Sequence, residues 1–112
     1  MSHENPPAEP DPKALKLYAF KVWSYKMGEV VSLMIHLGDR LGLYRAMGGA
    51  GAVTARELAE RTELDTRFVE EWMLGQAAAE LITRHDDGRF ELDSLGAAIL
   101  ADEDGSVDFA AG

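Results

Sequence analysis

The order of local patterns between residues 54 and 92 restricts the fold more than any other feature of the sequence. Thr54 and Glu57 form a Thr-x-x-Glu capping box, which predicts that a helix begins there. A tight turn follows, and Asp65 is a good N-cap for a second helix. The positions that this second helix is predicted to bury, spaced by three and four, are Phe68, Val69, Trp72, Met73 and Gln76 or Ala77.

A β-hairpin is predicted directly after these helices. Residues 81–85 are β-prone, Asp86–Gly88 forms a turn, and residues 89–92 alternate polar with apolar side chains. Ser94 is expected to cap a last short helix that ends at Leu100. Two helices joined by a short turn and followed by a two-stranded hairpin make a winged helix-turn-helix. The predicted fold class is therefore mainly α, with a hairpin wing.

Two long N-terminal helices are predicted over residues 13–47, with a break or kink at Gly28. The first helix is apolar on two sides, and such a helix must be buried on more than one side. One stripe contains Leu15, Tyr18, Val22 and Tyr25, and the other contains Phe20, Trp23 and Met27. The second helix carries one wide stripe of Val30, Val31, Leu33, Met34, Ile35, Leu37 and Leu41.

The 112 residues leave room for one domain with one hydrophobic core, expected over residues 13–100. Residues 1–12 hold all four prolines and are predicted to be a disordered leader, and residues 101–112 form an acidic tail.

The absence of cysteine excludes disulfides, thiolate catalysis and cysteine-based zinc sites. It also fits a reducing cytoplasm, which is the expected location. No apolar stretch is long enough to span a bilayer, so no membrane partner is expected.

The net charge of −9 is unevenly distributed. Residues 54–92 carry five basic and ten acidic side chains, and residues 93–112 carry five acidic side chains and no basic one. In the helix at the DNA-reading position, Arg67 stands among Asp65, Glu70 and Glu71. Phosphate contacts come mainly from lysine, arginine and backbone amides. The charge pattern therefore argues against a nucleic-acid partner.

Several segments resemble one known family, the N-terminal winged-helix domain of bacterial class I S-adenosylmethionine-dependent methyltransferases. The resemblance covers about residues 13–112, and the matching segments occur in family order. They are Gly38–Met47, Val53–Thr62, Arg67–Ala78, Gly88–Leu92 and Leu100–Asp104. The resemblance implies a domain that builds a dimer interface and helps to wall a substrate pocket. It also implies that S-adenosylmethionine binds to a separate Rossmann-like domain, and the chain is expected to end before such a domain begins.

No cofactor site is predicted in the chain itself. A methyltransferase cofactor site needs a strand that leads into a glycine-rich turn, where the backbone can approach the ligand closely. The only glycine cluster, Gly48–Gly51, follows a helical turn and is interpreted as a plain loop. His3, His36 and His85 lack a second ligand at metal spacing, so no metal is predicted. No residue is assigned a catalytic role, and the chain alone is expected to be inactive.

The expected partner is a second copy of the chain, bound through the N-terminal helices. The candidates for this interface, or for a substrate-facing wall, are Tyr18, Val22, Trp23, Tyr25, Met27, Val30 and Met34. Three functional hypotheses stay open. The chain is a dimerisation module of methyltransferase ancestry, the N-terminal part of a complete methyltransferase, or, alternatively, a winged-helix transcriptional regulator that binds DNA.

Overall fold

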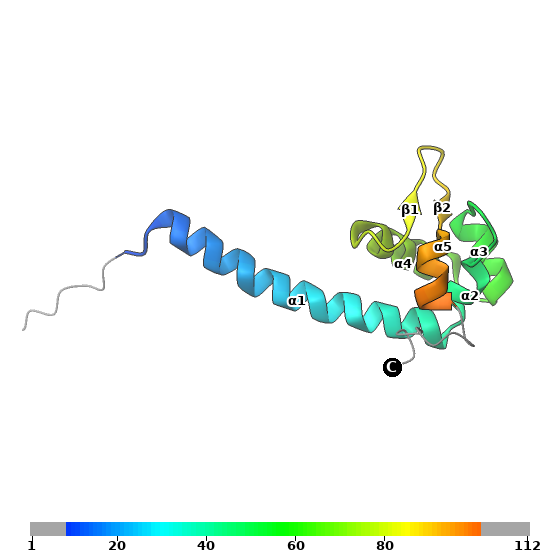
Figure 1. Ribbon diagram of the computed structural model, residues 1–112, viewed down its shortest axis with the longest axis horizontal. Helices are drawn as coiled ribbons and strands as arrows, with labels where there is room; N and C mark the ends of the chain where they lie inside the picture. Colours follow the sequence, from blue (N-terminus) through cyan, green and yellow to red (C-terminus); the bar gives the residue numbers. More distant parts are fainter. Residues whose placement is uncertain (1–8, 102–112) are drawn as a thin grey trace, which may run out of the picture. The chain divides into compact units, whose positions relative to one another are not determined.

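The computed structural model describes residues 9–101, which form helices and one short hairpin (Figure 1). The predicted leader and acidic tail lie outside the described residues, except for residues 9–12 and Ala101. The elements in chain order are α1 (Pro12–Arg40), α2 (Leu43–Met47), α3 (Ala55–Thr62), α4 (Thr66–Ala78), β1 (Thr83–Arg84), β2 (Phe90–Glu91), α5 (Ser94–Gly96) and the π-helical turn η1 (Ala97–Ala101). This order confirms a mainly α winged helix-turn-helix with a hairpin wing. The chain divides into two compact units, one up to Val30 and one from Val31 onward.

α1 is one continuous helix of 29 residues, so the predicted break at Gly28 and the two separate N-terminal helices are wrong. Asp11 accepts a hydrogen bond from the N–H of Ala14 at 3.2 Å. Pro12 then occupies the first helical position, where its missing N–H has no cost. Gly28 keeps an ordinary negative φ, and a Cβ built on it would meet nothing within 4 Å. A glycine in a helix interior costs only about 1 kcal/mol, which does not end a helix without a proline or a left-handed residue.

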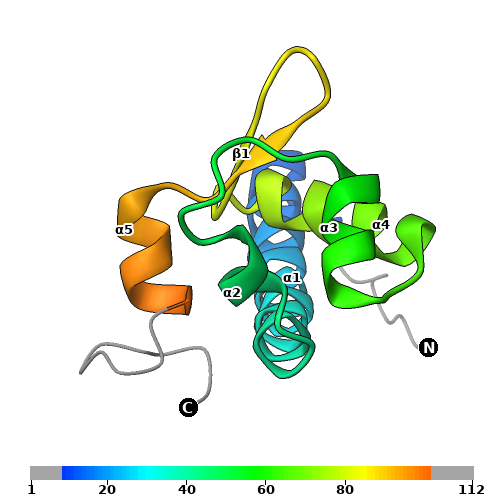
Figure 2. The ribbon, with the colours of Figure 1, turned by 90° about the vertical axis from the view of Figure 1, so that its right-hand side faces the viewer.

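The hydrophobic core of the second unit forms between α2, α3, α4 and the hairpin. Figure 2 shows α2 between α3 and α5, and α2 contacts both α3 and η1. The largest fully buried side chains are Trp72, Tyr44, Leu43, Met47, Leu58, Met73, Gln76, Val53 and Val69. Of the positions predicted to be buried on α4, Phe68 and Ala77 are half-buried and the other four are buried.

The predicted helix caps of α3 and α4 are confirmed. The Thr54 Oγ1 accepts from the N–H of Glu57 at 3.1 Å, and the Glu57 carboxylate accepts from the N–H of Thr54 at 2.9 Å. The Asp65 carboxylate accepts from the N–H of Phe68 at 2.9 Å. The last cap differs from the prediction, because Asp93 rather than Ser94 caps α5. Asp93 is the residue with extended backbone, and its Oδ1 accepts from the N–H of Gly96 at 2.8 Å.

The wing is a short antiparallel hairpin in which Thr83 pairs with Glu91 and Arg84 with Phe90. Phe90 also forms a backbone bridge with Val53, which ties β2 to the loop ahead of α3. Phe90 and Leu92 are buried while Arg89 is exposed. One side of the hairpin therefore packs on the core, as the alternation in the sequence predicts.

Candidate partner interface

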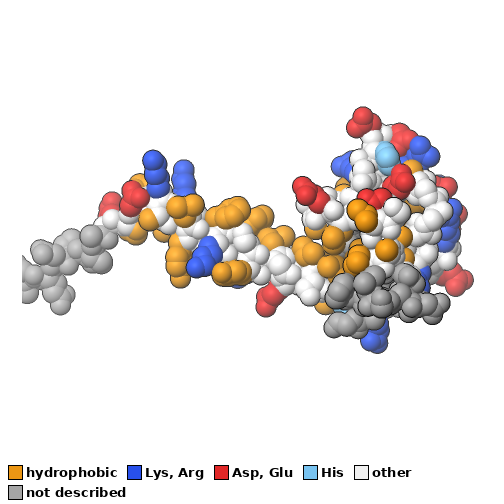
Figure 3. Space-filling view, in the orientation of Figure 1, with side chains coloured by type: hydrophobic (Ala, Val, Ile, Leu, Met, Phe, Trp, Pro, Cys, Tyr) orange, Lys and Arg blue, Asp and Glu red, His pale blue; other side chains and the backbone are white. Residues whose placement is uncertain are grey.

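Large apolar side chains along α1 are exposed (Figure 3). The exposed fraction is 69% for Tyr18, 57% for Trp23 and 68% for Tyr25. The predicted interface or substrate-wall candidates in this exposed set are Tyr18, Val22, Trp23, Tyr25, Met27 and Val30. The structure therefore brings these six candidates together on one helical segment.

The seventh candidate, Met34, has a different environment. Its side chain is half-buried and packs against the core of the second unit. Its carbonyl oxygen accepts a hydrogen bond from the indole N–H of Trp72 at 2.9 Å. The chain's own core thus covers part of the Met34 surface.

The exposed apolar side chains lie on two sides of α1. Successive residues of an α-helix are about 100° apart around its axis. The stripe formed by Leu15, Tyr18, Val22 and Tyr25 is named stripe A, and the stripe formed by Phe20, Trp23 and Met27 is named stripe B. The rings of Phe20 and Trp23 lie with their centroids 6.0 Å apart. A helix that is apolar on both sides is stable in water only when another surface covers it.

The charged side chains of α1 between Pro12 and Gly28 are all basic. Its lysines are Lys13, Lys16, Lys21 and Lys26, its first turn has no acidic residue, and the first acidic residue along the helix is Glu29. By contrast, residues 54–92 carry an excess of acidic side chains. The segment is therefore a basic, apolar surface attached to a predominantly acidic domain.

A notch of about 420 Å³ interrupts stripe A and is lined by Val22, Tyr25, Lys26 and Glu29. These residues stand at positions i, i+3, i+4 and i+7 of the helix. Four residues at this spacing form the hole that receives a side chain of a facing helix in a coiled coil. The notch was not predicted, although the spacing of its residues is visible in the sequence.

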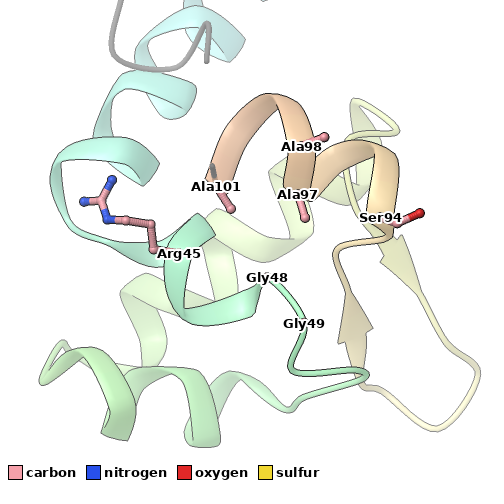
Figure 4. Close-up of a pocket in the computed structure, with 7 residues that line it drawn as sticks. All are labelled: Arg45, Gly48, Gly49, Ser94, Ala97, Ala98 and Ala101. Carbon is pink, nitrogen blue, oxygen red and sulfur yellow. The ribbon is translucent and has the colours of Figure 1, made fainter. Parts of the chain in front are cut away.

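A second hollow, of about 460 Å³, lies between α2 and η1 (Figure 4). It is lined by Arg45, Gly48, Gly49, Ser94, Ala97, Ala98 and Ala101. A Cβ on Gly48 would approach the Cβ of Ala101 at 3.1 Å, so the close contact favours glycine there. Arg45 is the one charged side chain of the lining, and it forms an ion pair with Asp39 at 3.1 Å. The lining holds no general acid or base beyond a single hydroxyl.

A buried polar pair lies in the core of the second unit. The Tyr44 hydroxyl donates a hydrogen bond to Oε1 of Gln76, and both side chains are fully buried. Burial, and to a smaller extent the Asp39 carboxylate, raises the pKa of the Tyr44 phenol. The Tyr44 phenol therefore stays neutral, and its role is to stabilise the core through its hydrogen bond to Gln76. The sequence did not predict this pair, because the two residues are far apart along the chain.

Three basic side chains, one on α4 and two in the wing, lie next to carboxylates. Arg67 is 3.6 Å from Glu71 on α4. In the wing, Arg89 is 2.8 Å from Asp87, and its hydrogen bonds lower the pKa of the Asp87 carboxyl. His85 is 3.0 Å from Glu91. These carboxylates reduce the positive potential that a phosphate backbone needs.

Residues 9–101 lack both a cluster of metal-binding side chains and a helix that could span a membrane. No group of three or more His, Cys, Asp or Glu side chains there could hold a metal ion. No helix within the same residues has the length and apolar character needed to cross a membrane.

The fold and the exposed helix define the class of protein. A capped helix pair, a two-stranded wing and a long helix ahead of them form a winged helix-turn-helix domain. A family model described as the Rv2258c-like winged HTH domain matches residues 29–101, and the chain belongs to this family. No curated protein matches the chain.

The fold is also similar to that of solved methyltransferase structures. The mitomycin 7-O-methyltransferase MmcR matches with a TM-score of 0.73 and 22% identity, over 82% of this chain and 27% of that chain. CalO1, a methyltransferase in calicheamicin biosynthesis solved with SAH, matches with a TM-score of 0.70 and 24% identity, over 93% and 29%. Human N-acetylserotonin methyltransferase in complex with SAM matches with a TM-score of 0.66 and 16% identity, over 83% and 27%.

These matches confirm the resemblance to methyltransferases at the level of the winged-helix fold. The chain spans less than a third of the length of the methyltransferases that it matches.

Proposed function

We propose that this chain is the dimerisation domain of a SAM-dependent methyltransferase, without catalytic activity of its own. In this proposal α1 binds a second copy of the chain, and the cofactor binds elsewhere in the enzyme. The observation that carries the proposal is the row of exposed apolar side chains on α1. Soluble proteins rarely expose more than a few hundred Å² of contiguous apolar surface unless the surface binds a partner.

The residue types on α1 support a protein partner. Aromatic residues and methionine are enriched at interface cores, and the exposed set includes Tyr18, Trp23, Tyr25 and Met27. Closed, two-fold symmetric dimers are the commonest protein assemblies. A second copy presents the same apolar stripes and therefore matches this surface in chemistry.

Stripe B gives the proposal its second part. Phe20, Trp23 and Met27 would form an apolar wall beside the methyl-acceptor site of the assembled enzyme. Relatives named for mitomycin and N-acetylserotonin methylation act on small molecules. Ligand pockets for such molecules are lined mainly by apolar and aromatic side chains.

A regulator that binds DNA is the competing function, and the ion pairs of the wing and of α4 disfavour it. Arg67, His85 and Arg89 each have a carboxylate within 3.6 Å. A DNA-binding domain would leave such side chains available for phosphate contacts.

Sedimentation of the full chain at tens of micromolar tests the proposal. We expect the unmodified chain to sediment as a dimer and Val22→Glu to sediment as a monomer, because a buried charge without a partner is costly. Ser24→Glu is the matched control, since it adds the same charge to the same helix about 200° away from Val22 around the axis. It should remain dimeric.

Two results would contradict the proposal. One is a compact monomer of the unmodified chain at the same concentration. The other is tight binding of the monomeric chain to vesicles that contain anionic lipid, which would make α1 a basic helix for membrane surfaces.

A further inference from the structure

The spacing of stripe A predicts how a facing helix would pack on it. Leu15, Tyr18, Val22 and Tyr25 alternate in steps of three, four and three, which is the a and d spacing of a coiled coil. The notch around Val22 and Tyr25 has the spacing that receives one side chain of the facing helix in a coiled coil. The seam thus has a defined centre, between Val22 and Tyr25.

The lysines beside the seam discriminate between the two orientations of a pair of identical helices. With Val22 at position a, Lys21 is at position g and Lys26 is at position e. In a parallel pair each g residue lies beside the e residue five positions later in the other copy. A parallel pair would therefore place Lys21 against Lys26 twice, and like charges in contact are destabilising.

An antiparallel pair centred between Val22 and Tyr25 avoids these contacts. In an antiparallel pair the g positions of one copy face the g positions of the other, and e positions face e positions. Lys21 therefore lies opposite Gly28 of the second copy, and Lys26 lies opposite Ala19 of the second copy. Sliding one helix along the other by one heptad brings Lys21 against Lys21 of the second copy. Sliding it by one heptad in the opposite direction brings Lys26 against Lys26 of the second copy. The lysines therefore favour one register among those that use this seam.

The seam positions Tyr18 and Val22 fit the same register. Tyr18 lies opposite Glu29 of the second copy, where its phenol O–H can donate to the carboxylate. Val22 enters the notch between Val22, Tyr25, Lys26 and Glu29 of the second copy. Antiparallel helices also place opposite ends of their dipoles side by side.

We infer that two copies of this chain pair through α1 in antiparallel orientation, with the two-fold axis between Val22 and Tyr25. The inference rests on the proposed dimerisation and adds its geometry. It assigns stripe A to the contact between the two α1 helices, and it leaves stripe B to other surfaces.

Cysteine cross-linking tests the orientation, because the chain contains no cysteine of its own. In the antiparallel pair, residue 18 is near residue 29 of the second copy but about 16 Å along the axis from residue 18 of that copy. Disulfides need Cα atoms within about 7 Å. The double variant Tyr18→Cys/Glu29→Cys should oxidise to a covalent dimer on a non-reducing gel. Tyr18→Cys and Glu29→Cys alone should each stay monomeric on that gel.

A charge variant tests the register independently. Ala19→Lys places a lysine opposite Lys26 of the second copy and should raise the dimer Kd several-fold at low salt, with a smaller effect at high salt. Ser24→Lys adds the same charge away from the seam and should leave the Kd unchanged.

Each outcome of these experiments decides a separate point. A covalent dimer of Tyr18→Cys alone would show a parallel pair and overturn the inference. A chain that sediments as a dimer but yields no cross-link in the double variant would also overturn it, because α1 would then contact another surface of the second copy. A monomeric unmodified chain would overturn the proposed dimerisation itself.

Discussion

Gly38 stands at the point where α1 approaches the aromatic core. A Cβ on Gly38 would lie 2.5 Å from Cζ2 of Trp72 and 2.6 Å from Cε2 of Tyr44. Both rings are fully buried, and their centroids are 5.0 Å apart. Neither ring can give way at low cost, because Trp72 donates to the carbonyl of Met34 and Tyr44 donates to Gln76.

We predict that Gly38→Ala lowers the free energy of unfolding. Overpacking of a tight core costs about 1–3 kcal/mol, which exceeds the gain of about 1 kcal/mol from the higher helix propensity of alanine. Gly75→Ala is the control, because Gly75 is also helical and a Cβ there would meet nothing within 4 Å. It should stabilise the chain. Urea denaturation compares the two variants, and a stabilising Gly38→Ala would contradict the tight contact of α1 with Trp72 and Tyr44.

The capping box of α3 gives a prediction about pH. Hydrogen bonds from the backbone and side chain of Thr54 lower the pKa of Glu57. A carboxyl with a lowered pKa in the folded state stabilises the fold above its unfolded pKa, and this stabilisation is lost as the pH falls through the folded value. The unmodified chain should therefore have a higher free energy of unfolding than Glu57→Gln at pH 7. The two free energies should converge as the pH falls into the acid range. A gap that stayed constant between pH 7 and pH 3 would show that the Glu57 charge has no role in the cap.

At the scale of elements, the sequence predicted the helices that carry their own end signals. The boundaries of α3 and α4 follow from Thr54, Glu57 and Asp65, whose hydrogen bonds are local. The continuity of α1 through Gly28 was not predictable in the same way, because a solitary glycine is compatible with either a kink or a straight helix. The Tyr44–Gln76 pair and the tight contact at Gly38 depend on tertiary packing, which a local pattern does not show.

The hairpin provides a prediction at this scale. Phe90 is 3% exposed and pairs with both Arg84 and Val53, so Phe90→Ala should cost roughly 3–5 kcal/mol. Arg84→Ala and Arg89→Ala should change stability by only about 0–1 kcal/mol, since exposed charges contribute little. Thermal or urea melts measure all three variants. The opposite ranking would mean that the faces of the hairpin are reversed.

At the scale of the whole molecule, the candidate interface was predictable as a set of residues but not as a geometry. Apolar periodicity identified both stripes of α1, because exposed apolar residues and core residues share the same spacing. The same spacing left Met34 among the candidates, although its side chain packs on the core. Periodicity cannot distinguish a surface that the chain covers itself from a surface that a partner covers.

The glycine cluster supports the last prediction, which concerns SAM. Gly48–Gly51 follows α2, and the described strands, β1 and β2, have two residues each and pair in a hairpin after α4. A nucleotide-type site places its glycine-rich turn between a strand and the N-terminus of a helix, where backbone N–H groups face the ligand. In residues 9–101 the cluster has no such strand ahead of it.

We therefore predict that this chain alone does not bind SAM. Titration calorimetry of the full chain with SAM and with SAH should give no heat beyond dilution. Gly49→Ala, with a φ of 73° at that position, should strain the loop and lower stability without any change in the titration. A Kd in the micromolar range would contradict the proposal that the cofactor binds in another part of a longer enzyme. Loss of that binding in Gly49→Ala would then place the site at the glycine cluster.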